Sequence, residues 1–401
     1  MNSGQTVFSQ LIEHLPMHSF RDCVRRYDGN RRTRTFSCWD QLLCMTFAQL
    51  TYRESLRDIV TCLRSLGPKL YHAGIRGRVS RSTLADANES RDWRIYADFA
   101  GELIRVARGL YRQDRFGVAL QETVYAFDST TVDLCLSIFP WAQFRRHKSA
   151  VKLHTLIDLR GNIPCFVHVS SGRVADVTAL DDLPIEAGAF YVMDRGYTDF
   201  RRLYAFTEGS AFFILRAKRD LDFARRSHRA VDRTTGLRSD QTIVLCGPKT
   251  ATLYPDPLRR IGYHAADLDR RFVFLTNNFT LPPLTVAQLY KCRWQVELFF
   301  KWIKHYLRIK AFYGTSINAV KTQVWIAVSV YVLVAIVKKR LALPRSLGEI
   351  LQILSIGLFE KTPILQALSQ HPDGVDHADF PNQLWLFDFL TLYVAPAVNS
   401  L

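Results

Sequence analysis

The segment TVYAFDSTTVDL at residues 123–134 begins a series of apolar, β-branched stretches that decides the fold. Four more stretches of this kind follow: VKLHTLIDLRG (151–161), IPCFVHVSS (163–171), AFYVMDRG (189–196) and AFFILRAK (211–218). Val, Ile, Phe and Tyr favour strands because their side chains pack well on a pleated, half-buried surface. The series therefore predicts successive strands of one sheet.

The connections between these stretches predict a mixed α/β sheet. Residues Leu159 to Asn162 separate the second and third stretches and contain Gly161, which suits a tight turn and an antiparallel hairpin. DVTALDDL at 176–183 is compatible with a helix and precedes the fourth stretch. No G-x-G-x-x-G motif follows the first stretch, so the sequence does not predict a dinucleotide-binding fold.

Two aspartates follow apolar stretches of this series. Asp128 comes directly after VYAF, and Asp194 comes directly after FYVM. Both are predicted at the C-terminal ends of strands, the edge of an α/β sheet where ligand-binding groups collect. Neighbouring strands would bring the two carboxylates within reach of one cation. A single aspartate of this kind is usually a turn or helix cap, but two in matching settings favour a functional pair.

A long amphipathic helix is predicted over residues 285–310, after Pro282 and Pro283. One face of it carries four polar residues: Tyr290, Arg293, Glu297 and Lys304. At 100° per residue these fall within an arc of roughly 60°. A separate apolar stripe is predicted to pack on the core: Val296, Phe299, Ile303 and Leu307. A solvated glutamate–lysine face would have the same spacing, so the spacing alone does not decide the role of the polar stripe.

The residue types of the polar stripe resemble a family signature. Y-x₂-R-x₃-E-x₆-K is typical of DDE transposases of the insertion sequence four family, and this chain matches it without gaps. Three further stretches resemble blocks of the same family: FDST (127–130), MDRGY (193–197) and FLTNNF (274–279). The resemblance is clearest over residues 120–310 and looser in the preceding helical part.

The resemblance implies an α/β fold with a ribonuclease-H-like mixed sheet, interrupted by a β-rich insertion and flanked by helical N- and C-terminal regions. It implies that Asp128, Asp194 and Glu297 are catalytic and hold two Mg²⁺ ions, which Mn²⁺ can replace. Two metals about 3.5–4 Å apart can activate an attacking oxygen and stabilise a leaving one in phosphoryl displacement. Tyr290 and its neighbours Arg293 and Lys304 are then expected to position DNA phosphates.

The expected activity is cut-and-paste movement of an insertion sequence. By the resemblance, the protein cleaves double-stranded DNA at terminal inverted repeats and joins the ends to target DNA, acting as a homodimer on DNA. Two alternatives stay open from the sequence. One is a transposase-derived DNA-binding protein that acts without catalysis, and the other is a ribonuclease-H-like nuclease without strand transfer.

Five parts of the chain are predicted. They are a helical N-terminal DNA-binding module (1–120), the first part of the catalytic core (121–218), a β-rich insertion (219–283), the signature helix that completes the core (284–310) and a helical C-terminal region (311–401). Strand-like stretches in the insertion are QTIVLC (241–246), TATLY (250–254), IGYHA (261–265) and RFVFLTNN (271–278). Ser37 and Ser82 are suitable N-caps for helices of the first part.

A strong positive charge makes nucleic acid the leading partner. The formal net charge is +16 and the isoelectric point is near 9.6, and such a surface attracts polyanions by releasing their counterions. Further candidate DNA contacts lie before and on the second predicted strand, and in a basic turn of the first part: Arg145, Arg146, Lys148, Lys152, Arg76, Arg78 and Arg81. His154 is a further candidate for lining the DNA channel. Solvated loops are the alternative interpretation for all of them.

Membrane insertion and secretion are not predicted. The longest apolar stretch, Val324 to Val337, is shorter than the roughly 20 residues that a bilayer requires, and it favours a buried core helix. The N-terminus has no basic segment followed by an apolar run, and the eight cysteines have no C-x-x-C spacing that would indicate zinc. We expect a cytoplasmic, nucleoid-associated prokaryotic protein.

Several other acidic and aromatic residues are weaker candidates for the site. Five acidic residues outside the triad are discounted as caps or turn residues: Asp133, Asp158, Asp176, Asp181 and Asp182. A flipped DNA base could stack on an aromatic side chain. Trp294 is expected in the core, and three aromatics of the insertion are unranked candidates for this role: Tyr254, Tyr263 and Phe272.

Overall fold

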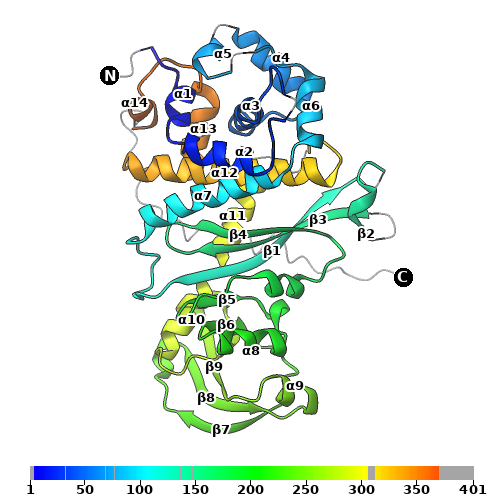
Figure 1. Ribbon diagram of the computed structural model, residues 1–401. Helices are drawn as coiled ribbons and strands as arrows, with labels where there is room; N and C mark the ends of the chain where they lie inside the picture. The colour runs from blue at the N-terminus through cyan, green and yellow to red at the C-terminus, as the bar shows by residue number, and fades with distance from the viewer. Residues whose placement is uncertain are drawn as a thin grey trace, which may run out of the picture. The chain divides into compact units, whose positions relative to one another are not determined.

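A mixed β-sheet organises the computed structural model of this chain (Figure 1). The structure describes residues 4–31, 33–67, 69–75, 77–135, 137–145, 148–305 and 312–369. Within them, ten strands form one sheet in the order β2-β3-β1-β5-β6-β10-β9-β8-β7, with β4 paired to β3. The described residues up to Leu368 form one compact unit.

Five strands make up the centre of the sheet: β1 (Val124–Leu134), β3 (Lys148–Asp158), β4 (Ile163–Ser171), β5 (Phe190–Met193) and β6 (Phe212–Arg216). β3 pairs antiparallel with both β1 and β4, whereas β5 is parallel to both β1 and β6. Helix α8 (Phe200–Glu208) connects β5 to β6, because parallel strands need a crossover connection. This mixed α/β arrangement is the expected ribonuclease-H-like fold, and the predicted fold class is confirmed. The short strand β2 (Gln143–Arg145) adds to the edge of β3.

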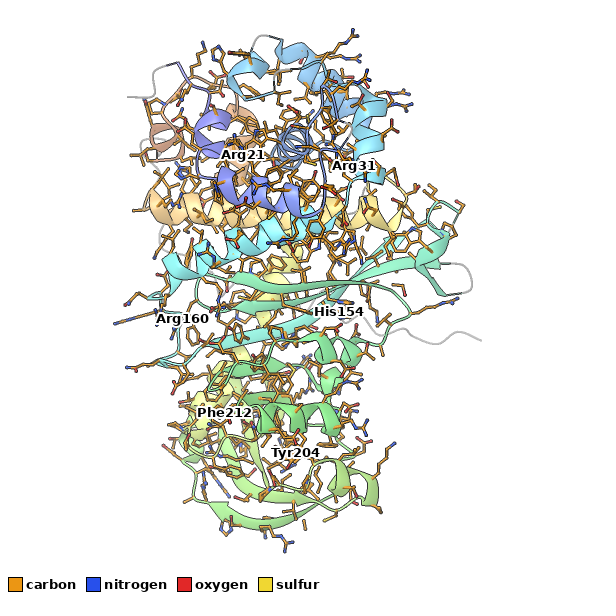
Figure 2. The ribbon with its side chains drawn as sticks, in the orientation of Figure 1. Arg21, Arg31, His154, Arg160, Tyr204 and Phe212 are labelled. Carbon is orange, nitrogen blue, oxygen red and sulfur yellow. The ribbon has the colours of Figure 1, made fainter. Side chains whose placement is uncertain are left out.

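The predicted hairpin between β3 and β4 is confirmed. Gly161 and Asn162, the last two residues of the four-residue connection, both adopt positive φ angles, of 79° and 56°, which glycine and asparagine tolerate best. A Cβ on Gly161 would collide with the ring of Tyr111, so glycine is also needed for packing. Arg160 at this turn donates to the carbonyl oxygen of Leu120 at 3.3 Å (Figure 2).

Both faces of the central strands are buried. In β5, Phe190 and Val192 belong to one hydrophobic cluster, whereas Tyr191 and Met193 belong to another on the opposite face. The first cluster is continuous with the helices before and after the sheet, and α8 covers the second. Parallel strands covered on both sides show continuous apolar sequence rather than alternation, which explains the unbroken run FYVM.

Two long helices pack side by side over β4 (Figure 1): α7 (Arg94–Tyr111) and α12 (Ile317–Arg340). Helix α12 is long and apolar enough to cross a membrane by length and composition, but 89% of its most apolar window is buried within the protein. The hydroxyl of Tyr331 on α12 donates to Asn162 O at 3.0 Å and thereby joins α12 to the β3–β4 turn. The prediction that Val324 to Val337 form a buried core helix is confirmed.

Shorter helices gather on the side of α12 away from the sheet (Figure 1). From the N-terminal part they are α1 (Val7–Ile12), α2 (Met17–Arg26), α3 (Cys38–Leu50), α4 (Leu56–Leu66), α5 (Lys69–His72) and α6 (Arg81–Ser90), and from the C-terminal part α13 (Leu347–Gly357) and α14 (Ile364–Ser369). Ser37 caps α3 in a capping box with Asp40. The predicted cap at Ser82 is wrong, because α6 begins at Arg81 and the Ser80 side chain accepts from Thr83 N–H.

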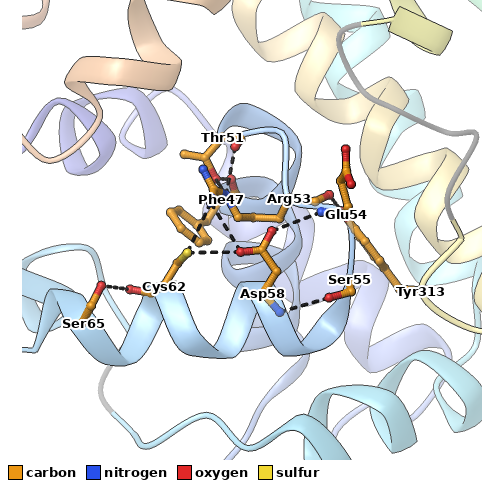
Figure 3. A network of polar contacts seen from close by, with 9 residues as sticks. All are labelled: Phe47, Thr51, Arg53, Glu54, Ser55, Asp58, Cys62, Ser65 and Tyr313. Atoms are coloured by element: carbon orange, nitrogen blue, oxygen red, sulfur yellow. Dashed lines mark hydrogen bonds and ion pairs between the residues drawn. The ribbon is translucent and has the colours of Figure 1, made fainter.

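A polar network fixes the turn between α3 and α4 (Figure 3). Arg53 donates from Nε to the carbonyl oxygen of Thr51 at 2.9 Å and forms an ion pair with Asp58 at 3.4 Å. Ser55 caps α4 by accepting from Asp58 N–H. The hydroxyl of Tyr313, which precedes α12, donates to the carbonyl oxygen of Arg53. The network therefore connects the N-terminal helices to the segment that leads into α12.

The β-rich insertion extends the central sheet. It contributes β7 (Phe223–Arg229), β8 (Leu237–Leu245), β9 (Leu258–Ala265) and β10 (Arg270–Thr276), and β10 pairs antiparallel with β6. Two expectations for this part are wrong. TATLY at 250–254 lies mostly in α9 (Pro248–Leu253), where Pro248 occupies the first turn, and β7 was not expected from the sequence FARRSHR because it is an exposed, arginine-rich edge strand.

The single helix expected over residues 285–310 is two helices. These are α10 (Pro283–Lys291) and α11 (Trp294–His305). At the break, Arg293 N–H donates to Tyr290 O and Val296 N–H donates to Arg293 O, both at 3.1 Å. Such bonds to the third preceding residue tighten the turn. Of the predicted apolar stripe, Val296, Phe299 and Ile303 are buried, and Leu307 lies outside the described residues.

A buried ion pair joins the insertion to the segment before α10. Arg259 on β9 donates from Nε and Nη2 to the two carboxylate oxygens of Asp240 on β8, both at 2.8 Å. The two side chains are only 2% and 3% exposed. Arg259 also donates to Leu281 O at 2.6 Å. This guanidinium therefore fixes the start of the helical segment that carries the signature residues.

Asp240→Asn is expected to lower the free energy of unfolding by about 3–5 kcal/mol, because it leaves the buried Arg259 without its counter-ion. Urea unfolding followed by circular dichroism measures the change. Glu102→Gln is the matched control, because the Glu102–Arg105 pair on α7 is 37% and 72% exposed and such pairs contribute about 0–1 kcal/mol. An Asp240→Asn loss as small as that of the control would contradict the structural role of the buried pair.

Candidate active site

Asp128 on β1 and Asp194, the residue directly after β5, lie side by side. The register pairs Phe127 on β1 with Met193 on β5, and each aspartate is the next residue along its strand. β5 ends at Met193, whereas β1 continues to Leu134. The prediction that Asp128 ends a strand is therefore wrong. It lies within β1, at the first position where β1 no longer has β5 as a neighbour.

Arg293 connects Asp128 to Glu297. The guanidinium donates from Nη1 to Asp128 Oδ2 and from Nη2 to Glu297 Oε1, both at 2.6 Å. The Arg293 side chain is 17% exposed and Asp128 is 21% exposed, but Glu297 is 48% exposed. Charge-assisted bonds from a planar guanidinium are strong and directional. One cation therefore brings a carboxylate of β1 together with a carboxylate of α11.

Tyr290 holds the second aspartate. Its hydroxyl donates to Asp194 Oδ1 at 2.9 Å, and its ring packs on Phe274 of β10 with centroids 4.8 Å apart. Burial and the neighbouring Asp194 carboxylate raise the pKa of Tyr290, so the phenol remains a neutral donor. The structure thus gives Tyr290 a carboxylate partner, where a phosphate contact was expected.

Lys304 reaches the same strand further along. Its Nζ donates to Thr131 O on β1 at 2.7 Å. Tyr290, Arg293, Glu297 and Lys304 all belong to the segment spanned by α10 and α11. Arg293 and Lys304 contact β1 directly, and Tyr290 contacts Asp194, the residue after β5. The break at Cys292 and Arg293 does not separate the four residues, because the tightened turn keeps them facing the sheet.

The electrostatics of Asp128 reflect a crowded carboxylate site. Burial above all, together with Glu297 and Asp194, raises the pKa of Asp128 to about 6, against the opposing effect of Arg293 and the Ser129 N–H. Ser129 N–H donates to Asp128 Oδ1 at 2.8 Å. Like charges disfavour ionisation at close range. The site therefore has more negative charge than Arg293 alone compensates.

This donor set fits a hard divalent cation. Carboxylate oxygens are the ligands that Mg²⁺ and Mn²⁺ prefer, and added positive charge would relieve the repulsion that raises the pKa of Asp128. In the described part of the chain, no three His, Cys, Asp or Glu side chains are already arranged to hold a metal ion. Arg293 lies between Asp128 and Glu297 and occupies one carboxylate oxygen of each.

Asp176 is a residue that sequence reasoning missed. It was expected as a helix N-cap, but the cap of its short 3₁₀ helix, η2 (Asp176–Asp182), is Ala175, without a side-chain cap bond. Asp176 Oδ1 instead accepts from Ser129 Oγ at 2.8 Å and pairs with Lys152 Nζ at 3.1 Å. Its sequence position, 48 residues from Asp128, gives no signal of this contact, although Ser129 in FDST is a polar residue directly beside the first aspartate.

The other discounted acidic residues with described ion pairs face elsewhere. Asp158 pairs with Arg108 at 3.3 Å, and Asp181 pairs with Arg202 at 2.7 Å. Asp182 lies 3.5 Å from His168. These contacts agree with structural roles for the three side chains.

The predicted basic DNA contacts differ in their settings. Arg78 and Arg81 are exposed. Lys152 is only 12% exposed, and besides pairing with Asp176 it donates to Val174 O at 2.8 Å. His154 is fully buried in the sheet (Figure 2), so its expected place in a DNA channel is wrong. Predicted contacts outside the described residues or side chains are Arg76, Arg145, Arg146 and Lys148.

The aromatic candidates are also separated by burial. Tyr254 is 1% exposed and therefore cannot stack on a DNA base. Trp294 was expected in the core, but it is only half-buried. Phe272 is half-buried and lies near the site, with its ring centroid 6.4 Å from that of Tyr290 and 5.4 Å from the Arg216 guanidinium. Tyr263 is half-buried on β9.

Comparisons with known proteins match two parts of the chain. Residues 119–333 match the family model described as "Transposase DDE domain", and residues 3–76 match "Domain of unknown function (DUF4372)". The chain is 32% identical to "Putative transposase y4zB" of Sinorhizobium fredii, over 65% of this chain and 73% of that protein. It is 30% identical to "Probable transposase for insertion sequence element IS5377" of Geobacillus stearothermophilus, over 55% and 58%.

A solved structure is also similar to this chain. It is a piggyBac transposase synaptic complex with hairpin DNA, at 10% identity and a TM-score of 0.42, with 98% of this chain and 84% of that chain covered.

The raised pKa of Asp128 predicts a pH-dependent stability in metal-free protein. A folded-state pKa of about 6, above the usual 3.8, means that the folded chain binds this proton more tightly than the unfolded chain. The folding stability that this proton contributes is fully present below the usual aspartate pKa of 3.8, and it is lost as pH rises through about 6. The unfolding free energy of wild type relative to Asp128→Asn should therefore fall by about 1–3 kcal/mol between about pH 4 and about pH 7.

Urea unfolding of both proteins at a series of pH values, with a chelator present, measures this difference. The comparison with Asp128→Asn cancels the pH dependence of all other groups that the substitution leaves unchanged. A difference that stays constant or increases with pH would contradict the raised pKa.

Proposed function

This chain belongs to the DDE transposase family and is a DNA transposase of the insertion sequence four type, and from this premise we propose that it moves an insertion sequence by cut-and-paste transposition. Cleavage takes place at the terminal inverted repeats, and the freed ends are then joined to target DNA. Both steps are displacements at phosphorus. The single observation that carries the proposal is the convergence of Asp128, Asp194 and Glu297 around Arg293 and Tyr290.

Domains of this family use divalent metal ions. We propose that Asp128, Asp194 and Glu297 hold two Mg²⁺ ions, which Mn²⁺ can replace. Bound ions of this kind activate the attacking oxygen and stabilise the leaving oxygen. The protein contributes three carboxylates from separate elements, two of which are already held in place by Tyr290 and Arg293.

Arg293 has two roles in this proposal. Without metal, its guanidinium neutralises Asp128 and Glu297 and keeps β1 and α11 together. Once its carboxylate partners are neutralised in another way, the same planar group would be free to donate to a phosphate of the DNA strand. Lys304 contacts β1 beyond Asp128 and provides a second positive charge for the same DNA strand.

We propose double-stranded DNA as the partner, with a homodimer bound to two transposon ends. The net charge of +16 supports this, as do exposed arginines on the N-terminal helices. Arg21 on α2 and Arg31 in the loop after it are exposed (Figure 2), like Arg78 and Arg81 around the start of α6. Arg145, Arg146 and Lys148 remain proposed channel residues. We also propose a nucleoid-associated location in the prokaryotic cytoplasm.

Glu297→Gln tests the catalytic proposal. Purified protein with Mg²⁺ and DNA that carries the flanking inverted repeats should cleave at the element ends. The variant should lose several kcal/mol of transition-state stabilisation, which is a rate loss of about a thousandfold or more. Glu208→Gln, at the exposed end of α8, is the matched control and should cleave as wild type does.

The alternatives give different results in the same assay. Absence of end cleavage by wild type would favour a DNA-binding protein without catalysis. Cleavage of any duplex regardless of its ends would favour a general nuclease. Cleavage that Glu297→Gln leaves unchanged would overturn the assignment of the site.

The exposed Arg21 and Arg31 of the N-terminal part are expected to contact DNA phosphates. Arg21→Ala combined with Arg31→Ala should weaken binding to duplex DNA and flatten the plot of log affinity against log salt by about 2, because each lost phosphate contact reduces the slope by about 0.9. Fluorescence anisotropy at several salt concentrations measures the slope. Arg105→Ala is the control, because that guanidinium pairs with Glu102. An unchanged slope in the double variant would exclude this surface as a DNA contact.

A further inference from the structure

Asp128 and Ser129 point to opposite faces of β1. Side chains alternate along a strand, and the buried residues of β1 follow this rule: Val124, Ala126 and Val132 pack in one hydrophobic cluster, and Tyr125 and Phe127 in the other. Asp128 therefore shares the face of the first cluster, which α11 covers. Ser129 shares the opposite face, where η2 lies.

Each face of β1 contributes a contact at this point. On one face, Arg293 donates to Asp128 Oδ2. On the other face, Ser129 Oγ donates to Asp176 Oδ1 at 2.8 Å. The backbone of Ser129 connects the two contacts, because its N–H donates to Asp128 Oδ1 at 2.8 Å. Both oxygens of the Asp128 carboxylate are thus held, one by α11 and the other through Ser129.

This part of β1 needs support that the sheet does not provide. β5 ends at Met193, so β1 has a paired neighbour only on the β3 side from Asp128 onward. Asp176 closes that gap from η2 and is itself fixed by Lys152 of β3, whose Nζ lies 3.1 Å from Asp176 Oδ1 and donates to Val174 O at 2.8 Å. Ser129 therefore donates to the Asp176 carboxylate, which is itself held in place by the largely buried Lys152.

The surroundings of this contact are unusually polar for the interior of a sheet. In the described structure, two buried atoms on the face of Ser129, His154 Nδ1 and Tyr197 Oη, have no hydrogen-bond partner, and neither has Thr155 Oγ1 on the face of Asp128. Thr155 lies opposite Asp128 and His154 lies opposite Ser129 in the β1–β3 register. Burying unpaired polar groups costs stability. A merely structural strand would favour apolar residues at these positions, so this polarity points to a role in the chemistry of Asp128.

We infer that Asp176 is a positioning residue of the catalytic centre, which holds the Ser129 hydroxyl from the opposite face of β1 and so fixes the Asp128 carboxylate through the Ser129 N–H. The inference rests on the proposed function, because it assumes that Asp128 binds a divalent ion. Groups that orient a metal-binding carboxylate in this way typically contribute about 10- to 100-fold to metal affinity or activity.

The test compares four variants with wild type: Asp176→Asn, Ser129→Ala, the two combined, and Asp182→Asn as the control. Asp182 lies on the same 3₁₀ helix and is 60% exposed. Binding of Mn²⁺ alone is measured by electron paramagnetic resonance of the free ion. Single-turnover cleavage of end DNA, DNA affinity without metal, and thermal unfolding are measured on the same samples.

Asp176→Asn and Ser129→Ala should each weaken Mn²⁺ binding and slow cleavage by about tenfold or more, with DNA affinity unchanged. The double variant should be no worse than either single variant, because both remove one chain of contacts. Asp182→Asn should match wild type. Ser129→Ala removes a single hydroxyl, so it gives the answer even where Asp176→Asn lowers folding yield.

Three results would overturn the inference. One is Mn²⁺ binding by Asp176→Asn and Ser129→Ala equal to that of wild type. Another is full additivity of the two substitutions. The third is a loss that follows thermal stability and DNA affinity together. If wild type itself fails to bind Mn²⁺ or to cleave, the proposed function is refuted, and the inference with it. This result is distinguishable from the three above, because in those the wild type binds Mn²⁺ and cleaves.

Discussion

The guanidinium of Arg293, lying between the carboxylates of Asp128 and Glu297, is the interaction on which the site depends. Three carboxylates from different parts of the chain approach one another here, and their repulsion contributes to the raised pKa of Asp128. Without a cation between them, β1 and α11 would be driven apart at the place where the chemistry requires them to meet. The chain therefore carries its own positive charge between these two carboxylates.

The sheet provides the geometry for this interaction through the unequal lengths of two strands. β5 ends at Met193 while β1 continues to Leu134, so the side chains just past the last shared pair are accessible from the α11 side. The insertion contributes at a distance. It lengthens the sheet through β10, and its buried Arg259 fixes the segment that leads into α10. The insertion therefore helps to position the helical segment that carries the signature residues.

The three carboxylates are not equally constrained. Asp194 is held by the Tyr290 hydroxyl, and Asp128 is held by Arg293 and by Ser129 N–H. Glu297 is about half exposed, and Arg293 is the one partner that the described structure gives it. Asp128 lies in the sheet and Asp194 directly follows it, whereas Glu297 lies on helix α11. This division suits a site that must accept a polyanion without losing its shape.

Local patterns in the sequence determined much of this protein. The apolar runs predicted the central strands, the glycine-containing turn predicted the β3–β4 hairpin, and the residue types and spacing from Tyr290 to Lys304 indicated the family. Only the tertiary structure decided that the signature segment breaks at Arg293, that TATLY forms a helix and that Asp176 supports Asp128 through Ser129. The reason is physical: periodicity and side-chain type act over a few residues, whereas a helix break or a carboxylate contact depends on groups that are distant in sequence and meet only after the sheet has formed.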